Sequence, residues 1–78
     1  MSLKQREEQT EALSNRIKKN EKRQNEVNRL IKKMYEENIS GKLSDKRLAD
    51  MLKDYEAELL KLEKSLAADY EEQEKTDI

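Results

Sequence analysis

The hydrophobic positions of the sequence follow a heptad pattern in two separate segments. In the first segment the seam positions alternate in steps of four and three residues: Leu13, Ile17, Asn20, Gln24, Val27, Ile31 and Met34. The second segment repeats the alternation at Leu48, Leu52, Tyr55, Leu59, Leu62 and Leu66. This spacing places apolar side chains along one face of a helix, where a partner helix can cover them. The pattern predicts two long amphipathic helices, over about 4–38 and 45–75.

The segment between them, residues 39–44, is typical of a turn that ends one helix and starts another. Gly41 is the only glycine of the chain and can take the left-handed conformation that ends a helix. Ser44 can cap the second helix, and Leu43 and Leu48 flank this cap with the spacing of a hydrophobic staple. A short connection makes the two helices antiparallel. The predicted fold is all-α, a long two-helix antiparallel coiled-coil hairpin.

Two registers, one heptad apart, can align the predicted helices. The first sets Ile17 opposite Leu62 and Val27 opposite Leu52, so that the apolar layers have apolar partners. The second shortens the loop but sets Ile17 opposite Asp69. We expect the first register, because the second exposes apolar seam residues to polar ones.

Asn20 and Gln24 are polar residues at seam positions. A polar seam residue can specify the register of a coiled coil at some cost in stability, which is the interpretation we favour. The alternative is a polar site for a ligand or for a third helix.

The composition restricts the fold further. Charged residues make up 45% of the 78 residues, proline is absent and the only aromatic residues are three tyrosines, so strands and a sizeable globular core are not expected. Such a composition also occurs in disordered chains, but those lack a regular apolar seam.

The two arms differ in charge. Residues 1–41 carry ten Lys or Arg against seven Asp or Glu, and residues 42–78 carry seven Lys or Arg against eleven Asp or Glu. The two arms should therefore attract each other weakly.

The residue types exclude most catalytic chemistry. The chain has no cysteine and no histidine, which removes thiol nucleophiles, imidazole bases and the usual zinc ligands. The carboxylate pairs Glu36–Glu37 and Glu71–Glu72 would lie on exposed helices, without the concave pocket that catalysis needs. We expect no enzyme, no catalytic residue, no cofactor, no metal and no small-molecule substrate.

The sequence contains no apolar run near the roughly 18–20 residues that cross a bilayer and no signal-peptide pattern. A soluble, cytoplasmic protein without a membrane partner is the expectation. Residues 1–3 look like an expression leader, which leaves one hairpin domain over 4–78, and the ending Thr76-Asp77-Ile78 suggests a piece of a larger protein.

Lys18, Lys22, Arg29 and Lys33 recur along one outward face of the first helix and could contact phosphates. No aromatic residue is interleaved with them and the chain as a whole is slightly acidic, with a net charge of −1. A solvated helix face is therefore the favoured interpretation, and a nucleic-acid-binding hairpin is the alternative.

The apolar stripe widens near the turn, where a two-helix rod cannot cover all of it. We predict a partner contact at this hairpin tip, formed by Leu30, Met34, Tyr35, Ile39, Leu43, Leu48 and Met51. The alternative is a local plug that closes the loop, formed by Leu30, Tyr35, Ile39 and Leu43.

The same region carries three sequence blocks: Leu-Ile-Lys-Lys-Met-Tyr-Glu at 30–36, Ser-Gly-Lys-Leu-Ser-Asp at 40–45 and Met-Leu-Lys-Asp-Tyr-Glu-Ala-Glu at 51–58. They resemble the coiled-coil region in the C-terminal part of large serine recombinases, the resolvase/invertase relatives that include serine integrases. The resemblance covers roughly the central half of the chain. Leu48 departs from it, because a bulkier aromatic residue is expected there.

The resemblance implies a protruding arm that self-associates with the arm of another subunit and helps to hold or regulate the synapse between two DNA sites. In that family the serine nucleophile and the zinc-ribbon region lie in other parts of the protein, so DNA would be contacted only by parts absent from this chain. Ser40 belongs to the turn and does not correspond to the nucleophile. The rival without the resemblance is a generic coiled-coil oligomerisation or spacer element.

Overall fold

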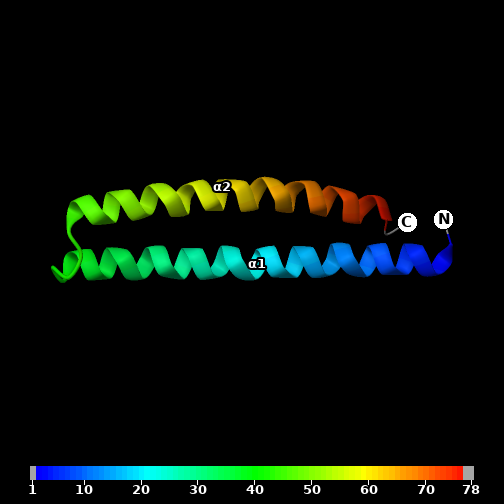
Figure 1. Ribbon diagram of the computed structural model, residues 1–78, viewed down its shortest axis with the longest axis horizontal. Coiled ribbons are helices and arrows are strands. Elements are labelled where there is room, and N and C mark those ends of the chain that lie inside the picture. Colours follow the sequence, from blue (N-terminus) through cyan, green and yellow to red (C-terminus); the bar gives the residue numbers. More distant parts are fainter. Residues whose placement is uncertain (1, 77–78) are drawn as a thin grey trace.

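The computed structural model describes residues 2–76 and contains two long helices, α1 (Leu3–Ile39) and α2 (Asp45–Thr76). Figure 1 shows them side by side and antiparallel, joined by a turn at one end of the rod. The rod measures 58 × 15 × 15 Å. The predicted all-α hairpin is confirmed, and each observed helix end lies within one residue of the predicted one. Met1, Asp77 and Ile78 lie outside the described residues.

The first helix starts at a capping box. The Ser2 hydroxyl accepts a hydrogen bond from the Gln5 N–H at 3.2 Å, and the Gln5 side chain accepts one from the Ser2 N–H at 3.0 Å. This reciprocal pair satisfies two of the N–H groups that a helix start leaves unpaired. Two residues of the expected leader, Ser2 and Leu3, thus take part in the start of α1.

The turn follows the predicted chemistry. Gly41 has a φ of +84°, in the left-handed region. The Lys42 N–H then donates to the Glu37 carbonyl at 2.9 Å, which closes the end of α1. Ser44 caps α2 by accepting a hydrogen bond from the Arg47 N–H at 3.2 Å. The predictions for the glycine and for the serine cap are both confirmed.

Asn38 braces the two ends of the turn. Its side-chain amide donates to the Leu43 carbonyl at 3.0 Å and to the Asp45 carboxylate at 2.7 Å. One side chain at the end of α1 therefore holds both the turn and the first residue of α2. The connection is only five residues long, 40–44, and has little freedom to lengthen.

The side-chain contacts between the helices define their register. The Arg16 guanidinium donates two hydrogen bonds to the Asp69 carboxylate, both at 3.0 Å, and the Tyr70 hydroxyl donates to Glu21 at 2.7 Å. These contacts place Asp69 at the level of Ile17. In the expected register Asp69 would lie about 9 Å further along the rod, six residues past the position opposite Arg16. The expected register is therefore wrong, and the helices take the alternative one.

Burial of the seam agrees with this alignment. Val27 is fully buried and Met34 is buried. In the observed register Val27 faces Leu59 and Met34 faces Leu52, whereas the expected register would have set Met34 opposite the charged Asp45. Leu13, Ile17 and Leu66 form a buried cluster nearer the open end of the rod.

Two physical effects favour the observed register over the better apolar match. The expected register needs a longer loop, but the hydrogen bonds of the connection hold it short. Asp69 is only 7% exposed, but its carboxylate is fully engaged by the Arg16 guanidinium. A buried charge is tolerated when an opposite charge binds it with good geometry. Asp69, whose charge was the reason to expect the other register, is thus accommodated in this one.

Asn20 and Gln24 are half-buried and lie opposite Leu66 and Leu62 in this alignment. No buried side-chain nitrogen or oxygen within residues 2–76 lacks a hydrogen-bond partner, so neither amide is trapped unsatisfied in the seam. Their role in specifying the register remains a prediction.

Replacing Gly41 tests the turn. We expect Gly41→Ala to lower the free energy of unfolding by about 1–2 kcal/mol, because a side chain makes the left-handed conformation unfavourable. The added Cβ would meet no surrounding atom within 4 Å, so the loss comes from local backbone strain and not from a clash with the rest of the protein. Gly41→Asn should lose less, since asparagine enters this region more readily. Urea unfolding followed by circular dichroism measures both, and an alanine variant as stable as the wild type would contradict the assignment.

A second prediction concerns the charge in the seam. Arg16→Ala should destabilise the hairpin, because it leaves the Asp69 carboxylate in the seam without its partner. Asp69→Leu should stabilise it, because the new leucine faces Ile17 and the exposed Arg16 side chain can return to solvent. The urea midpoints of the two variants are expected on opposite sides of the wild-type value. A destabilising Asp69→Leu would show that the carboxylate contributes more than the apolar contact that replaces it.

Candidate interaction surfaces

The rod has two flanks, one on each side of the seam. In an antiparallel coiled coil the e positions of both helices lie on one side and the g positions on the other. The Glu21–Tyr70 hydrogen bond joins two e positions, and the Arg23–Glu58 ion pair joins two g positions. Both pairings join like positions across the seam, as an antiparallel pair of helices requires.

We call the side of the e positions and the neighbouring b positions the tyrosine flank. In α1 it comprises Lys4, Glu7, Glu11, Ser14, Lys18, Glu21, Asn25, Asn28, Lys32, Tyr35 and Ile39. In α2 it comprises Lys46, Ala49, Lys53, Glu56, Leu60, Glu63, Ala67, Tyr70 and Glu74. The opposite side, of the g and c positions, contains Arg16 and Arg23 and is called the arginine flank.

The arginine flank is held together by ion pairs between the helices. Arg16 binds Asp69 and lies 3.8 Å from Glu72, and Arg23 binds both carboxylate oxygens of Glu58 at 2.6 and 2.9 Å. Two-point pairing of a guanidinium with a carboxylate fixes orientation as well as distance. The guanidinium groups of Arg16 and Arg23 are therefore engaged within the chain.

These pairs shift the pKa values of their members. The hydrogen bond from Arg23 holds the pKa of Glu58 below its ordinary value, and the hydrogen bond from Arg16 does the same for Asp69. The pKa values of the two guanidinium groups are raised in return by the same bonds. On the tyrosine flank, the hydrogen bond to Glu21 raises the pKa of the Tyr70 hydroxyl. The two carboxylates thus stay charged in the folded hairpin at acidity that protonates free ones.

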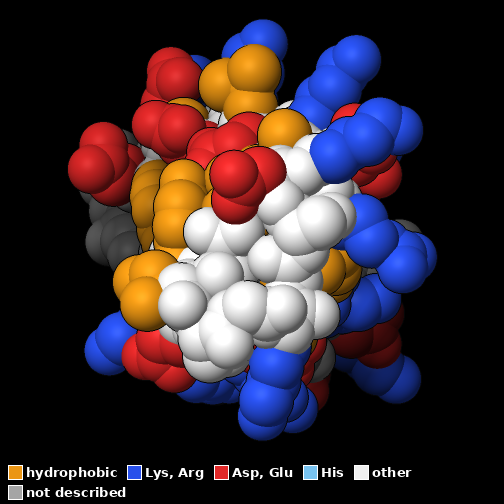
Figure 2. Space-filling view, turned by 90° about the vertical axis from the view of Figure 1, so that its left-hand side faces the viewer, with side chains coloured by type: hydrophobic (Ala, Val, Ile, Leu, Met, Phe, Trp, Pro, Cys, Tyr) orange, Lys and Arg blue, Asp and Glu red, His pale blue; other side chains and the backbone are white. Residues whose placement is uncertain are grey.

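The seven residues expected at the hairpin tip do not form one surface. Met34 is buried in the seam, and Leu43 and Leu48 are half-buried. Leu30 and Met51 occupy facing g positions on the arginine flank, where each is 37% exposed. Figure 2, the view onto the turn, shows hydrophobic side chains reaching the surface in separate places, mainly at the left and upper edges, around a centre of backbone and uncharged side chains.

Tyr35 and Ile39 lie on the tyrosine flank instead. The side chain of Tyr35 is 47% exposed and that of Ile39 is 84% exposed. The alternative prediction of a plug that closes the loop is therefore wrong, because Ile39, Tyr35 and Leu30 are not packed into the turn. The tip carries exposed apolar residues, but on two separate faces.

The sequence interpretation missed two exposed apolar residues on the tyrosine flank, Leu60 and Tyr70. Leu60 is 52% exposed and directly follows the seam residue Leu59, so its position in the heptad marks it as outward-facing. Tyr70 follows Asp69 and reaches across to α1 through its hydroxyl. The signal that could have found both is the heptad position of each residue rather than the width of the apolar stripe.

The basic residues singled out on α1 are Lys18, Lys22, Arg29 and Lys33, and all four side chains are exposed. Within the described part of the chain only Lys33 has a nearby carboxylate, Glu37 at 3.9 Å. The acidic pair at 71–72 is also engaged, since Glu71 lies 3.5 Å from Lys75. The arrangement is that of solvated helix faces.

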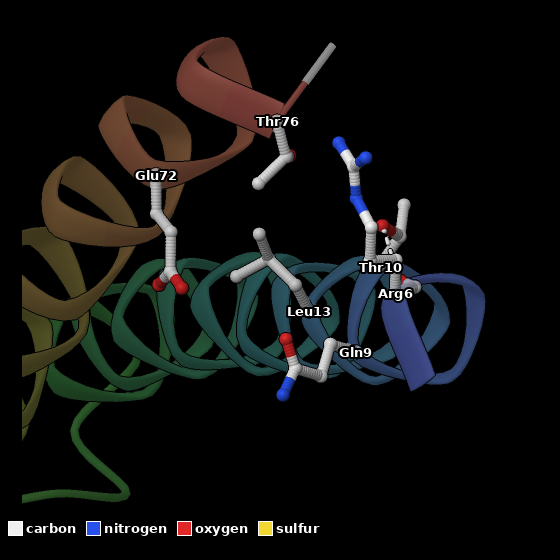
Figure 3. A pocket seen from close by; sticks show the side chains of 6 residues that line it. All are labelled: Arg6, Gln9, Thr10, Leu13, Glu72 and Thr76. Carbon is white, nitrogen blue, oxygen red and sulfur yellow. Dashed lines mark hydrogen bonds between the residues drawn. The ribbon is translucent and has the colours of Figure 1, made fainter. Parts of the chain in front are cut away.

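A shallow cavity of about 190 Å³ lies where α2 ends against α1. Figure 3 shows its lining residues: Arg6, Gln9, Thr10, Leu13, Glu72 and Thr76. The Thr10 hydroxyl already donates to the Arg6 carbonyl at 2.8 Å. The cavity marks the end of apolar packing beyond Leu13.

Residues 2–76 contain neither a cluster of three metal-ligating side chains nor a helix long and apolar enough to span a membrane.

The lowered pKa values predict how stability depends on pH. A carboxylate whose pKa is depressed by folding stabilises the hairpin above its ordinary pKa, and this contribution is lost as the pH falls through the lowered value. The ordinary values here are 3.8 for Asp69 and 4.5 for Glu58. The double variant Asp69→Asn/Glu58→Gln should be less stable than the wild type at neutral pH, and the two should converge below pH 3.8.

Urea midpoints measured across this pH range test the convergence, with Glu8→Gln, on the outer face of α1, as the control. A difference that stays constant down to the lowest pH would show that the variants act through packing rather than through charge.

No protein-family model matches the sequence, and comparisons with curated proteins and with solved structures gave no significant match. The two flanks and the tip of the hairpin are therefore the basis on which a function can be inferred.

Proposed function

We propose that the chain is a non-catalytic coiled-coil interaction module of a site-specific serine recombinase, an arm that mediates contacts between subunits during DNA recombination. The observation that carries the proposal is the exposure of Ile39 and Tyr35 at the far end of a rod 58 Å long. Apolar side chains left uncovered at the tip of an extended arm are suited to contact another protein.

The shape of the molecule supports a role in contact rather than in chemistry. A two-helix rod presents long convex surfaces, whereas ligand and active sites are usually concave and partly closed to water. The pKa shifts of Asp69 and Glu58 arise from ion pairs that align the helices, so they have a structural explanation. The most distinctive surface is the turn end.

The position of the recombinase-like blocks in the fold adds to this argument. Residues 30–36, 40–45 and 51–58 come from both helices and from the turn, and the antiparallel fold brings them together in the half of the rod that contains the turn. The resemblance is thus concentrated where the uncovered apolar residues are. A generic coiled-coil spacer would place no requirement on this end beyond a stable turn.

The test uses recombination by the parent protein. Tyr35→Lys on the tyrosine flank and Met51→Lys on the arginine flank are made separately, because the two residues lie on different faces. At least one is expected to abolish recombination while circular dichroism shows unchanged helicity. Ala57→Lys, on the exposed outer face of α2, is the matched control and should recombine normally.

Normal recombination by both tip variants would reject the tip contact and favour the spacer. The gene of the parent provides an independent check, since a catalytic domain with a serine nucleophile is expected upstream of this segment. Its absence would remove the recombinase assignment and leave a generic oligomerisation element.

A further inference from the structure

The tyrosine flank carries charges of opposite sign at its two ends. Towards the turn it presents Lys32, Lys46 and Lys53, and none of the three lies within ion-pair distance of a carboxylate of residues 2–76. Towards the open end it presents the carboxylates of Glu7, Glu11, Glu21, Glu63 and Glu74, which outnumber Lys4 and Lys18 there, so the net charge of this half is negative. The arginine flank differs, because Arg16 and Arg23 are paired across the seam. The tyrosine flank thus holds two sets of complementary charges that a single hairpin cannot bring together.

One row of α2 shows this pattern most simply. The b positions of successive heptads are occupied by Lys46, Lys53, Leu60, Ala67 and Glu74. Leu60, the exposed leucine, is at the centre of the row, and Lys46 and Glu74 are equally far from it, about 21 Å in opposite directions. Reversing the row about Leu60 exchanges the positions of Lys46 and Glu74. A row with this property is complementary to its own reversed copy.

We propose that two copies of the hairpin associate side by side and antiparallel through their tyrosine flanks, with Leu60 on the twofold axis. In this arrangement Lys46 of each copy meets Glu74 of the other, and the two Leu60 side chains meet each other. On α1, Lys32 and Glu21 lie about 9 and 7.5 Å on either side of the level of Leu60, so they also meet across the axis. The product is a four-helix bundle in which each helix packs against its own copy.

Symmetry and surface area agree with a second copy as the occupant. A twofold interface uses the same patch on both subunits, so that patch must be complementary to itself, as this flank is. A flank that runs the length of a rod 58 Å long and 15 Å wide offers on the order of 800 Å² per copy, the size of a typical specific interface. Glu56 and Glu63 come together near the axis, and Lys18 comes near Lys32 of the other copy, so these like charges oppose association. The dimer is therefore expected to be weak, with dissociation in the micromolar range.

This inference uses the same flank as Tyr35 and Ile39 but is centred on Leu60, about 20 Å along the rod from Ile39, and it does not depend on the parent being a recombinase. A hairpin that stays monomeric would reject it and would leave a tip contact in the assembled parent possible, because tethering raises the effective concentration. Loss of recombination in the Met51→Lys variant, whose changed residue lies on the arginine flank, would likewise leave the side-by-side dimer untouched. The two proposals can fail separately.

The first experiment is a charge exchange, measured by sedimentation equilibrium of the hairpin at low salt. Lys46→Glu and Glu74→Lys should each weaken the dimer by about tenfold or more, because each turns two attractive pairs into repulsive ones. The double variant Lys46→Glu/Glu74→Lys should recover the wild-type affinity to within about threefold. Within one hairpin the two residues lie about 42 Å apart, so recovery cannot come from a contact inside the monomer.

The second experiment uses the absence of cysteine from the sequence. A residue on a twofold axis meets itself, so Leu60→Cys should form a disulfide-linked dimer under mild oxidation. Met51→Cys on the arginine flank and Ile39→Cys at the tip are the matched controls, because both side chains are also exposed. Linkage at position 60 well above that at 51 and 39 supports the proposal. A wild-type monomer at all concentrations, a double variant that stays dissociated, or preferential linkage at 39 or 51 overturns it.

Discussion

The alignment of the two helices depends on the ion pair between Arg16 and Asp69. A carboxylate in a coiled-coil seam is unfavourable unless a cation binds it, and here the guanidinium reaches over the edge of the seam and makes two hydrogen bonds. The short connection at residues 40–44 favours the same alignment from the other end of the rod. Once the alignment is fixed, it decides which residues face each other, which are buried and which flank each exposed side chain occupies.

The fold could be predicted from the sequence because its determinants are local. Heptad spacing, a single glycine and a serine cap each act within a few residues, and together they gave the helix ends and the turn to within one residue. The register could not be predicted from apolar matching alone. That criterion treated Asp69 as an unpaired charge, although Arg16 lies near enough in the observed alignment to neutralise it, and it gave no weight to the hydrogen bonds that keep the loop short.

The residues expected to form one partner surface lie on two separate faces, for a related reason. Exposed apolar residues do lie near the turn, but Leu30 and Tyr35 occupy g and e positions and therefore point to opposite sides of the seam. Counting them as one widened stripe ignored the direction of each side chain. Leu60 was not predicted as a contact residue, because only residues in or beside the seam were considered. An outward-facing leucine on an otherwise charged helix face can nevertheless mark a contact with another protein.

The antiparallel turn also has a consequence for whatever is continuous with the hairpin. Ser2 and Thr76 lie at the same end of the rod, with the helix axes on the order of 10 Å apart. The first helix therefore runs along the length of the rod, which is 58 Å, and the second helix returns to the end where the first one starts. A hairpin of this kind can project from a protein as a lateral arm. It extends the reach of that protein by one rod length while the points where the hairpin starts and ends stay close together.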